Sequence, residues 1–198
     1  MKPELNTQFG TLAICQSVVE TLKPIFEGTD KELDKVGSVA RYHKRFNTAA
    51  DVKQNVTRRG CIQIAGLNVI NVQRSAGYTI GTIQFAAFVI TDDHYGKNRA
   101  ERAELIAGRL GMTVVSPDFS RKLGDVAHSQ VEQARWQSLT NQAFDDIGVA
   151  IWAVEWQQEC RLNTPSDTAS MDDFITCDMT MLQSDGGPQL RATIELEQ

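Results

Sequence analysis

The chain has 198 residues, of which 41% are apolar and 23% charged, and a formal net charge of −5. These values are typical of a globular protein with one domain, or one domain and an appendage, and they exclude a disordered or fibrous chain. The longest apolar runs, residues 85–90 and 148–154, fall far short of the roughly 20 residues of a membrane-spanning helix. Residues 1–6 also lack the apolar stretch of a signal peptide, so we expect neither export nor membrane insertion.

Charge is distributed unevenly along the sequence. Residues 31–60 contain eight basic and three acidic side chains, whereas the stretch from Glu159 to the end contains eight acidic and two basic ones. The two segments could neutralise each other within one chain, or meet between copies and steer their association. Solvated surfaces are the simplest interpretation of both. The candidate interface residues taken from these segments are Lys44, Arg45, Arg58, Arg59, Asp172 and Asp173.

The first elements predicted are helical. Apolar side chains recur at helical spacing over residues 11–22, and this helix should end before Pro24, because the residue before a proline is biased out of helical geometry. A short strand is expected at about residues 36–41. Residues 51–58 could form one or two further helical turns, with Thr48 as the cap.

Strands dominate the next part of the chain. Short β-branched segments at residues 61–65 and 68–72 predict two strands separated by a turn or bulge at Gly66. Residues 79–91 predict a longer strand, and both of its alternating sets of side chains are apolar. Such a pattern indicates a strand that is covered on both faces.

The second half predicts one more helix and one more long strand. Asn98 can cap a helix over residues 99–110, and Gly111 is placed to end it. Residues 112–130 are expected to be mostly loop, with at most a short strand. Residues 147–161 alternate as a strand does, and the three tryptophans, Trp136, Trp152 and Trp156, are expected to be core or interface anchors.

The order of these elements predicts an α+β fold. It consists of a mostly antiparallel, mixed β-sheet packed by two α-helices on one face. Residues 174–182 and 190–196 also alternate, and they follow a polar linker, so they predict a C-terminal β-hairpin extension. We therefore divide the chain into a core domain, residues 1–162, and a hairpin extension, residues 163–198.

No catalytic motif appears in the sequence. Nucleophile-elbow, P-loop, zinc-helix and dinucleotide-binding patterns are all absent. Asp92, Asp93 and His94 could supply metal ligands, but a surface turn after a strand is the simpler interpretation. We therefore expect no enzyme activity, no metal and no cofactor. The cysteines form no C-x-x-C pair and are expected to be buried free thiols: Cys15, Cys61, Cys160 and Cys177.

The layout resembles the tail terminator family of Mu-like tailed bacteriophages. The resemblance rests on the N-terminal helix, the strand ending Phe88-Val89-Ile90-Thr91, the helix over residues 98–110, and the segment 141–162, which runs from Asn-Gln-Ala-Phe to Glu-Cys-Arg-Leu. Residues 174–180 and the strand after them are also similar to that family. Residues 27–60 match this pattern least.

The resemblance implies a structural virion protein without catalysis. Such a protein forms a hexameric ring that caps the tail tube, stops its polymerisation and provides the surface for joining the head or neck. The implied partners are other copies of the chain, the tail tube protein, the sheath where there is one, and a neck or head-completion protein. DNA would pass through the ring without specific binding. The implied location is the tail or neck of the virion, after assembly in the host cytoplasm.

Three other functions fit the same features. One is that of another head–tail joining protein of the neck. The second is a nucleic-acid-binding accessory function that uses the basic and aromatic side chains of residues 41–59. The third is a hydrolase with an unrecognised site. Oligomeric state separates these functions, because only the first shares ring formation with a tail terminator.

Overall fold

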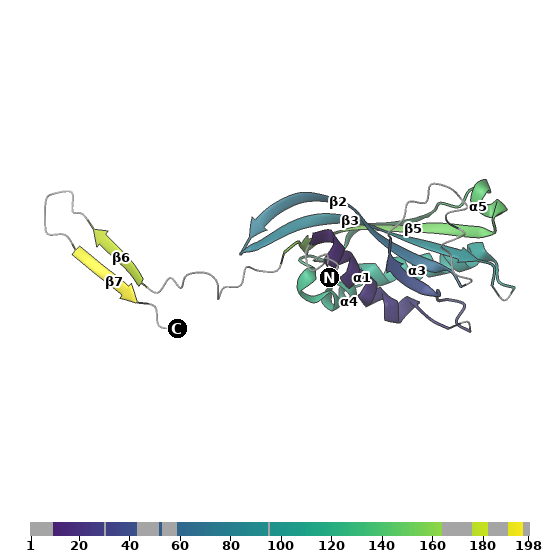
Figure 1. Cartoon of the computed structure of the whole chain (residues 1–198), viewed down its shortest axis with the longest axis horizontal. Coiled ribbons are helices and arrows are strands. Elements are labelled where there is room, and N and C mark those ends of the chain that lie inside the picture. The colour runs from purple at the N-terminus through teal and green to yellow at the C-terminus, as the bar shows by residue number, and fades with distance from the viewer. Residues whose placement is uncertain are drawn as a thin grey trace, which may run out of the picture. The chain divides into compact units, whose positions relative to one another are not determined.

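A five-stranded sheet forms the centre of the larger of two structural units, Met1–Thr164; Pro165–Gln198 forms the other (Figure 1). The strand order is β1-β2-β3-β5-β4, with β1 parallel to β2 and all other neighbours antiparallel. The predicted α+β class with a mostly antiparallel sheet is confirmed. The elements of this unit are α1 (Gly10–Phe26), β1 (Ser38–Arg41), β2 (Cys61–Ser75), β3 (Tyr78–Asp92), α3 (Arg99–Val115), α4 (Pro117–Lys122), the 3-10 helix η1 (Gly124–Val126), β4 (Glu132–Ser138), α5 (Gln142–Asp146) and β5 (Val149–Arg161). The computed structural model describes residues 10–29, 31–42, 52, 59–94, 96–163, 176–181 and 190–195.

The main core lies on one face of the sheet, here called the helix face. Side chains of α1, α3 and α4 pack there against alternate residues of β2, β3 and β5 in a single buried cluster. Within it, the Trp156 ring stacks on that of Phe85 with 5.1 Å between ring centroids, and Phe119 of α4 meets Trp156 edge-on at 6.3 Å. The two helices predicted on one face are therefore α1 and α3, and α4 joins them.

A smaller cluster covers one end of the other face, here called the open face. There, Phe144 of α5 and Ile147 pack against Ile90 and its neighbours on β2 and β5. Farther along β3, the open-face position is taken by the polar Gln84, which lies opposite Gln157 of β5. The predicted two-sided cover of β3 thus fails at Thr82 and Gln84, which are polar and half-buried, whereas Ile80 beyond them on the same face is buried.

Both helix ends that the sequence predicted are wrong. α1 continues through Pro24 to Phe26. Leu22 and Phe26 are both fully buried and lie four residues apart on one side of the helix, so the packing of Phe26 offsets the hydrogen bond that Pro24 cannot donate. α3 begins as predicted, with the Asn98 side chain accepting from the Ala100 amide at 2.7 Å.

Gly111 does not end α3 as the sequence predicts, but is needed there for a different reason. α3 runs past it to Val115, and Ser116 follows as the cap. A Cβ atom at position 111 would lie 2.5 Å from the ring of Trp136 on β4. The glycine therefore makes room for a neighbouring indole rather than ending the helix.

Other local predictions also need correction. β2 is one continuous strand, although the bulge expected at Gly66 is present between Gly66 and Asn68. A second irregularity lies between Ile70 and Gln73, where Asn71 has a φ of 53°. The stretch predicted as loop, residues 112–130, holds the end of α3, α4 and η1 instead, and neither β4 nor α5 was expected.

The smaller unit contains two described strands, β6 (Thr176–Met181) and β7 (Leu190–Glu195), which pair antiparallel. Of the helical turns expected at residues 51–58, only Val52 falls within the described chain, and Thr48 lies outside it.

We expect the Trp156→Ala substitution to lower the free energy of unfolding by about 3–5 kcal/mol, because it leaves a cavity between β5, β3 and α4. Chemical denaturation measures this loss. Gln157→Ala, a neighbouring change on the open face, is the matched control and should cost no more than about 0.5 kcal/mol. Equal effects of the two substitutions would contradict the packing described above.

Candidate interaction surfaces

Of the six residues predicted from charge, the structure describes only Arg59. Arg59 is half-buried, and its Nη1 donates to the Gly28 carbonyl at 2.6 Å. Its own carbonyl accepts from Nη2 of Arg102 at 3.2 Å. This part of the basic stretch therefore joins the start of β2 to the turn after α1. The other five lie outside the described residues: Lys44, Arg45, Arg58, Asp172 and Asp173.

Arg102 of α3 links three backbone segments. Its guanidinium is almost fully buried and also donates to the carbonyls of Asp92, at 2.8 Å, and Leu33, at 3.2 Å. Its Nη1 lies 3.6 Å from Oδ1 of Asp92. Burial lowers the pKa of Arg102 and raises the pKa of the Asp92 carboxyl. Because this buried guanidinium binds carbonyls from three separate backbone segments, its role is structural.

The turn between α1 and β1 contains several charged side chains, and some of them form ion pairs. Asp34 forms an ion pair with Arg109 of α3, whose guanidinium lies 5.6 Å from the centre of the Phe26 ring. Lys35 lies 2.6 Å from the carboxylate of Glu32. Lys35 of this turn and Arg109 of α3 are therefore both paired within the larger unit.

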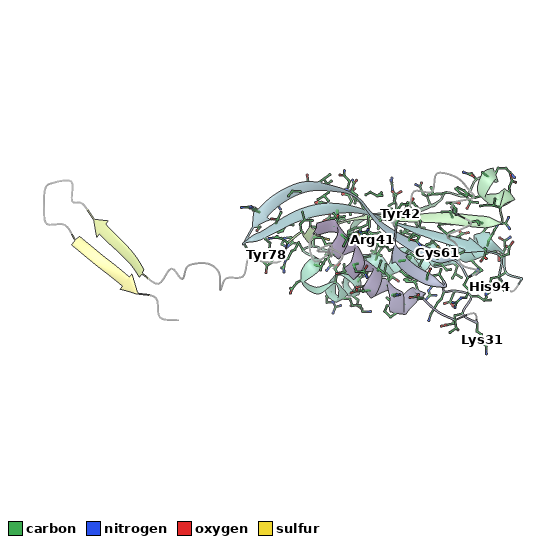
Figure 2. The ribbon with its side chains drawn as sticks, viewed as in Figure 1. Lys31, Arg41, Tyr42, Cys61, Tyr78 and His94 are labelled. Atoms are coloured by element: carbon green, nitrogen blue, oxygen red, sulfur yellow. The ribbon has the colours of Figure 1, made fainter. Side chains whose placement is uncertain are left out.

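The turn after β3 anchors the start of α3. Asp93 accepts from the backbone and the guanidinium of Arg99, at 2.9 and 2.7 Å, and Arg99 also reaches Asp145 of α5 at 2.8 Å. Hydrogen bonding to Asp145 raises the pKa of Arg99. His94 lies at the far end of β3 from Tyr78 (Figure 2). Among the described residues, no group of three side chains is placed to hold a metal ion.

The three cysteines of the larger unit are poor nucleophiles. Cys15, Cys61 and Cys160 are buried free thiols, as the sequence predicts. Burial raises the pKa of Cys61 to about 11 and that of Cys160 to about 12. Both stay protonated at neutral pH, and the protonated thiol is the unreactive form.

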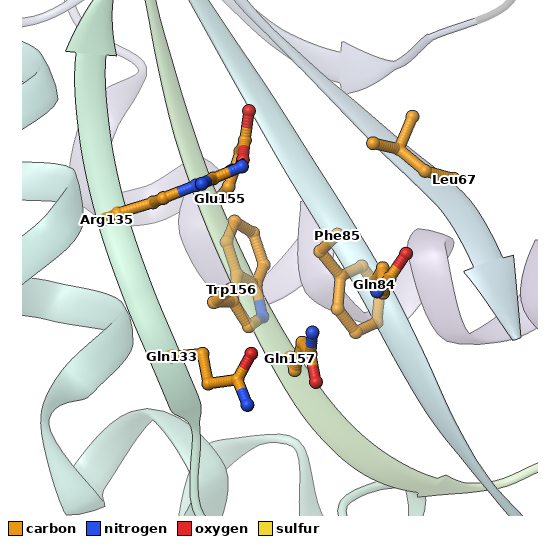
Figure 3. Close-up of a pocket in the computed structure, with 8 residues that line it drawn as sticks. All are labelled: Leu67, Gln84, Phe85, Gln133, Arg135, Glu155, Trp156 and Gln157. Atoms are coloured by element: carbon orange, nitrogen blue, oxygen red, sulfur yellow. Dashed lines mark hydrogen bonds and ion pairs between the residues drawn. The ribbon is translucent and has the colours of Figure 1, made fainter. Parts of the chain in front are cut away.

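A groove of about 570 Å³ crosses the open face over β3 and β5. Figure 3 shows Leu67 on one side of it and Arg135 on the other. Nε of Arg135 donates to Glu155 at 2.6 Å, so the only charged pair in the groove is internally neutralised. Amides supply most of the remaining polarity, and the described lining holds no nucleophile with a neighbouring base. The lining residues are Leu67, Gln84, Phe85, Gln133, Arg135, Glu155, Trp156 and Gln157.

Exposed apolar side chains gather on two separate surfaces. The first, which we name the β2 edge, consists of Leu67 and Val72. β1 pairs with Cys61–Ile64 only, so the rest of β2 has no outer neighbouring strand within the described chain. The second, which we name the α3–β4 surface, lies at the other side of the sheet and consists of Leu105, Met112, Val115 and Trp136. Of the exposed large apolar residues of the described chain, only Leu139, which lies opposite Ile151 on the open face, belongs to neither surface.

Only part of this arrangement is predictable from the sequence. The sequence predicts that Trp136 is a core or interface anchor, but it predicts that Met112 lies in a loop. The missed signal is the spacing of Leu105, Gly108, Met112 and Val115, which places them on one stripe of a helix. That stripe becomes visible only when α3 is known to continue past Gly111.

In comparisons with known proteins, no family model matches this chain, and no curated protein matches it. Within the described residues, no helix has the length and apolar character needed to cross a membrane.

We expect Glu32→Gln to change how stability depends on pH. Hydrogen bonding to Lys35, together with Thr29, lowers the pKa of Glu32 to about 2 from an ordinary 4.5. A carboxyl with a lowered folded-state pKa adds stability above its unfolded pKa, and this stability is lost as pH falls through the folded value. Glu32→Gln should therefore be less sensitive to acid between pH 4.5 and about 2.

Thermal unfolding measured across that pH range tests the expectation. Glu20→Gln on α1 is the control, because Glu20 accepts from the neutral amide of Gln16 rather than from a cation. Parallel pH profiles for wild type and Glu32→Gln would show that the Lys35 contact does not form in solution.

Proposed function

We propose that this protein is a structural virion protein, a tail terminator that forms a ring, caps the tail tube and stops its polymerisation. Its outer surface would then join the head or neck. The segments that carry the sequence resemblance correspond to α1, the end of β3, α3, and α5 with β5. α1, α3, β3 and β5 all contribute to one buried cluster, so the resemblance involves the structural centre of the larger unit.

The observation that carries the proposal is the presence of two different apolar surfaces on one subunit. A closed ring is built from a heterologous interface, in which one patch of each subunit binds a different patch of the next. The β2 edge and the α3–β4 surface supply two such patches on opposite sides of the sheet. Isolated exposed apolar residues need no explanation, but the location of six of the seven described ones on two surfaces favours interaction sites.

The test combines assembly and tube capping. The purified full chain should form a closed ring by native mass spectrometry and electron microscopy. When it is added to the polymerising tail tube protein of the same phage, tubes should stop growing and carry a ring at one end.

Each alternative gives a different result. A ring that leaves tube growth unchanged would indicate another joining protein of the neck and overturn the terminator proposal. A monomer that binds DNA in a salt-sensitive way would favour the nucleic-acid-binding function instead. Catalytic turnover by a monomer would favour an enzyme.

We also expect reversal of Lys44 and Arg45 to Glu to weaken subunit or tube association while preserving the fold. Exposed ion pairs contribute about 0–1 kcal/mol each, so the loss should be modest. It should shrink as salt is added, because the Debye length is about 8 Å at physiological ionic strength. Arg59 is left unchanged because it donates to the Gly28 carbonyl.

Ring formation and tube capping across a salt series provide the measurement. Lys122→Glu on the exposed end of α4 is a control for charge reversal elsewhere on the surface, with half the change of net charge. If the Lys44 and Arg45 variant matches wild type at every salt concentration, the basic stretch is a solvated surface.

A further inference from the structure

We infer that the β2 edge of one copy docks against the α3–β4 surface of the next copy. This inference rests on the proposed function and deepens it, because it identifies the two halves of the ring interface. The two surfaces of a single chain cannot meet, since β3 and β5 lie between β2 and β4. Only a second molecule can bring them together.

Strand direction permits this contact in a rotational ring. β2, β3, β5 and β4 alternate in direction across the sheet. β4 therefore runs opposite to β2, and neighbouring copies in the same orientation place the outer side of β4 antiparallel to the β2 edge. That is the direction in which an antiparallel sheet continues from one molecule to the next.

The α3–β4 surface is shaped to admit another chain. Leu105, Met112 and Val115 form an apolar stripe along α3, and Gly108 lies within it. A Cβ atom at position 108 would have nothing within 4 Å, so a neighbouring side chain can approach the helix backbone there. Trp136 flanks the stripe, and Met112 is 70% exposed.

Charge also favours contact between unlike surfaces. Arg74 is the only charged residue between Gly60 and Asp92, and it lies at the exposed end of β2. The α3–β4 side carries three exposed carboxylates that form no ion pair within the described chain: Glu101, Glu104 and Glu132. Two copies joined through their α3–β4 surfaces would bring carboxylates onto both sides of one interface, whereas β2 contributes an arginine and no carboxylate.

Complementation between two damaged copies tests the inference. Val72→Glu damages the β2 edge, and Met112→Glu damages the α3–β4 surface. Because both side chains are largely exposed, the fold should survive, as circular dichroism can check. Each variant alone should need at least a tenfold higher concentration to assemble than wild type.

An equimolar mixture should form dimers and nothing larger. The intact α3–β4 surface of the Val72→Glu chain binds the intact β2 edge of the Met112→Glu chain, and the remaining surfaces are both damaged. Ala143→Glu, which adds a negative charge on the exposed side of α5 and belongs to neither surface, should assemble as wild type does. Native mass spectrometry distinguishes these species directly.

The possible failures are separable. If wild type forms rings and either variant does so equally well, this interface is wrong while the proposed function stands. If both variants are monomeric and their mixture is too, the two surfaces do not bind each other and the inference is overturned. A wild type that stays monomeric at every concentration would overturn both proposals. Should a glutamate variant unfold, Val72→Ser and Met112→Ser replace it in the same experiment.

Discussion

The unbroken antiparallel pairing of β3 with β5 determines where the other parts of the larger unit lie. The two strands stay in register from the pair Ile80 and Arg161 to the pair Asp92 and Val149. Side chains therefore alternate consistently between the two faces over this whole length. One face receives α1, α3 and α4, and the other is covered by an apolar cluster at one end and carries polar side chains such as Gln84 and Gln157 farther along. Both interaction surfaces lie outside this pair, one on each side.

Long-range packing explains which parts of the fold could be predicted from the sequence. β3 and β5 were predictable because their alternation of side chains is a local pattern, and the Asn98 cap is equally local. The end of α3 was not, because the role of Gly111 depends on Trp136, a residue 25 positions away. β4 escaped prediction because it is a largely polar strand at the sheet edge. Six of its seven residues are exposed, and the seventh is half-buried. Tertiary contacts override local signals at these places.

The interaction surfaces show the same limit. Charge counts pointed to Arg59, but its hydrogen-bonding partner is a carbonyl 31 positions earlier in the chain, and no sequence pattern announces such a contact. The apolar surfaces are visible in the sequence as single residues such as Val72 and Met112, which would ordinarily be assigned to a core. Only the strand order shows that they lie at opposite sides of one sheet. The strand order, rather than the composition, therefore identifies these residues as parts of two candidate interaction surfaces.

The position of Trp136 over Gly111 has a practical consequence. Trp136 is 40% exposed, whereas Trp156 is 1% exposed. Indole fluorescence shifts to shorter wavelengths when water leaves the ring, and a ring fixed against a helix backbone cannot respond by turning away. The protein thus carries its own optical reporter on the α3–β4 surface, and its signal adds to those of the buried Trp156 and the partly buried Trp152. Subunit docking can be followed in real time on the native chain, without a label that might itself occupy the surface.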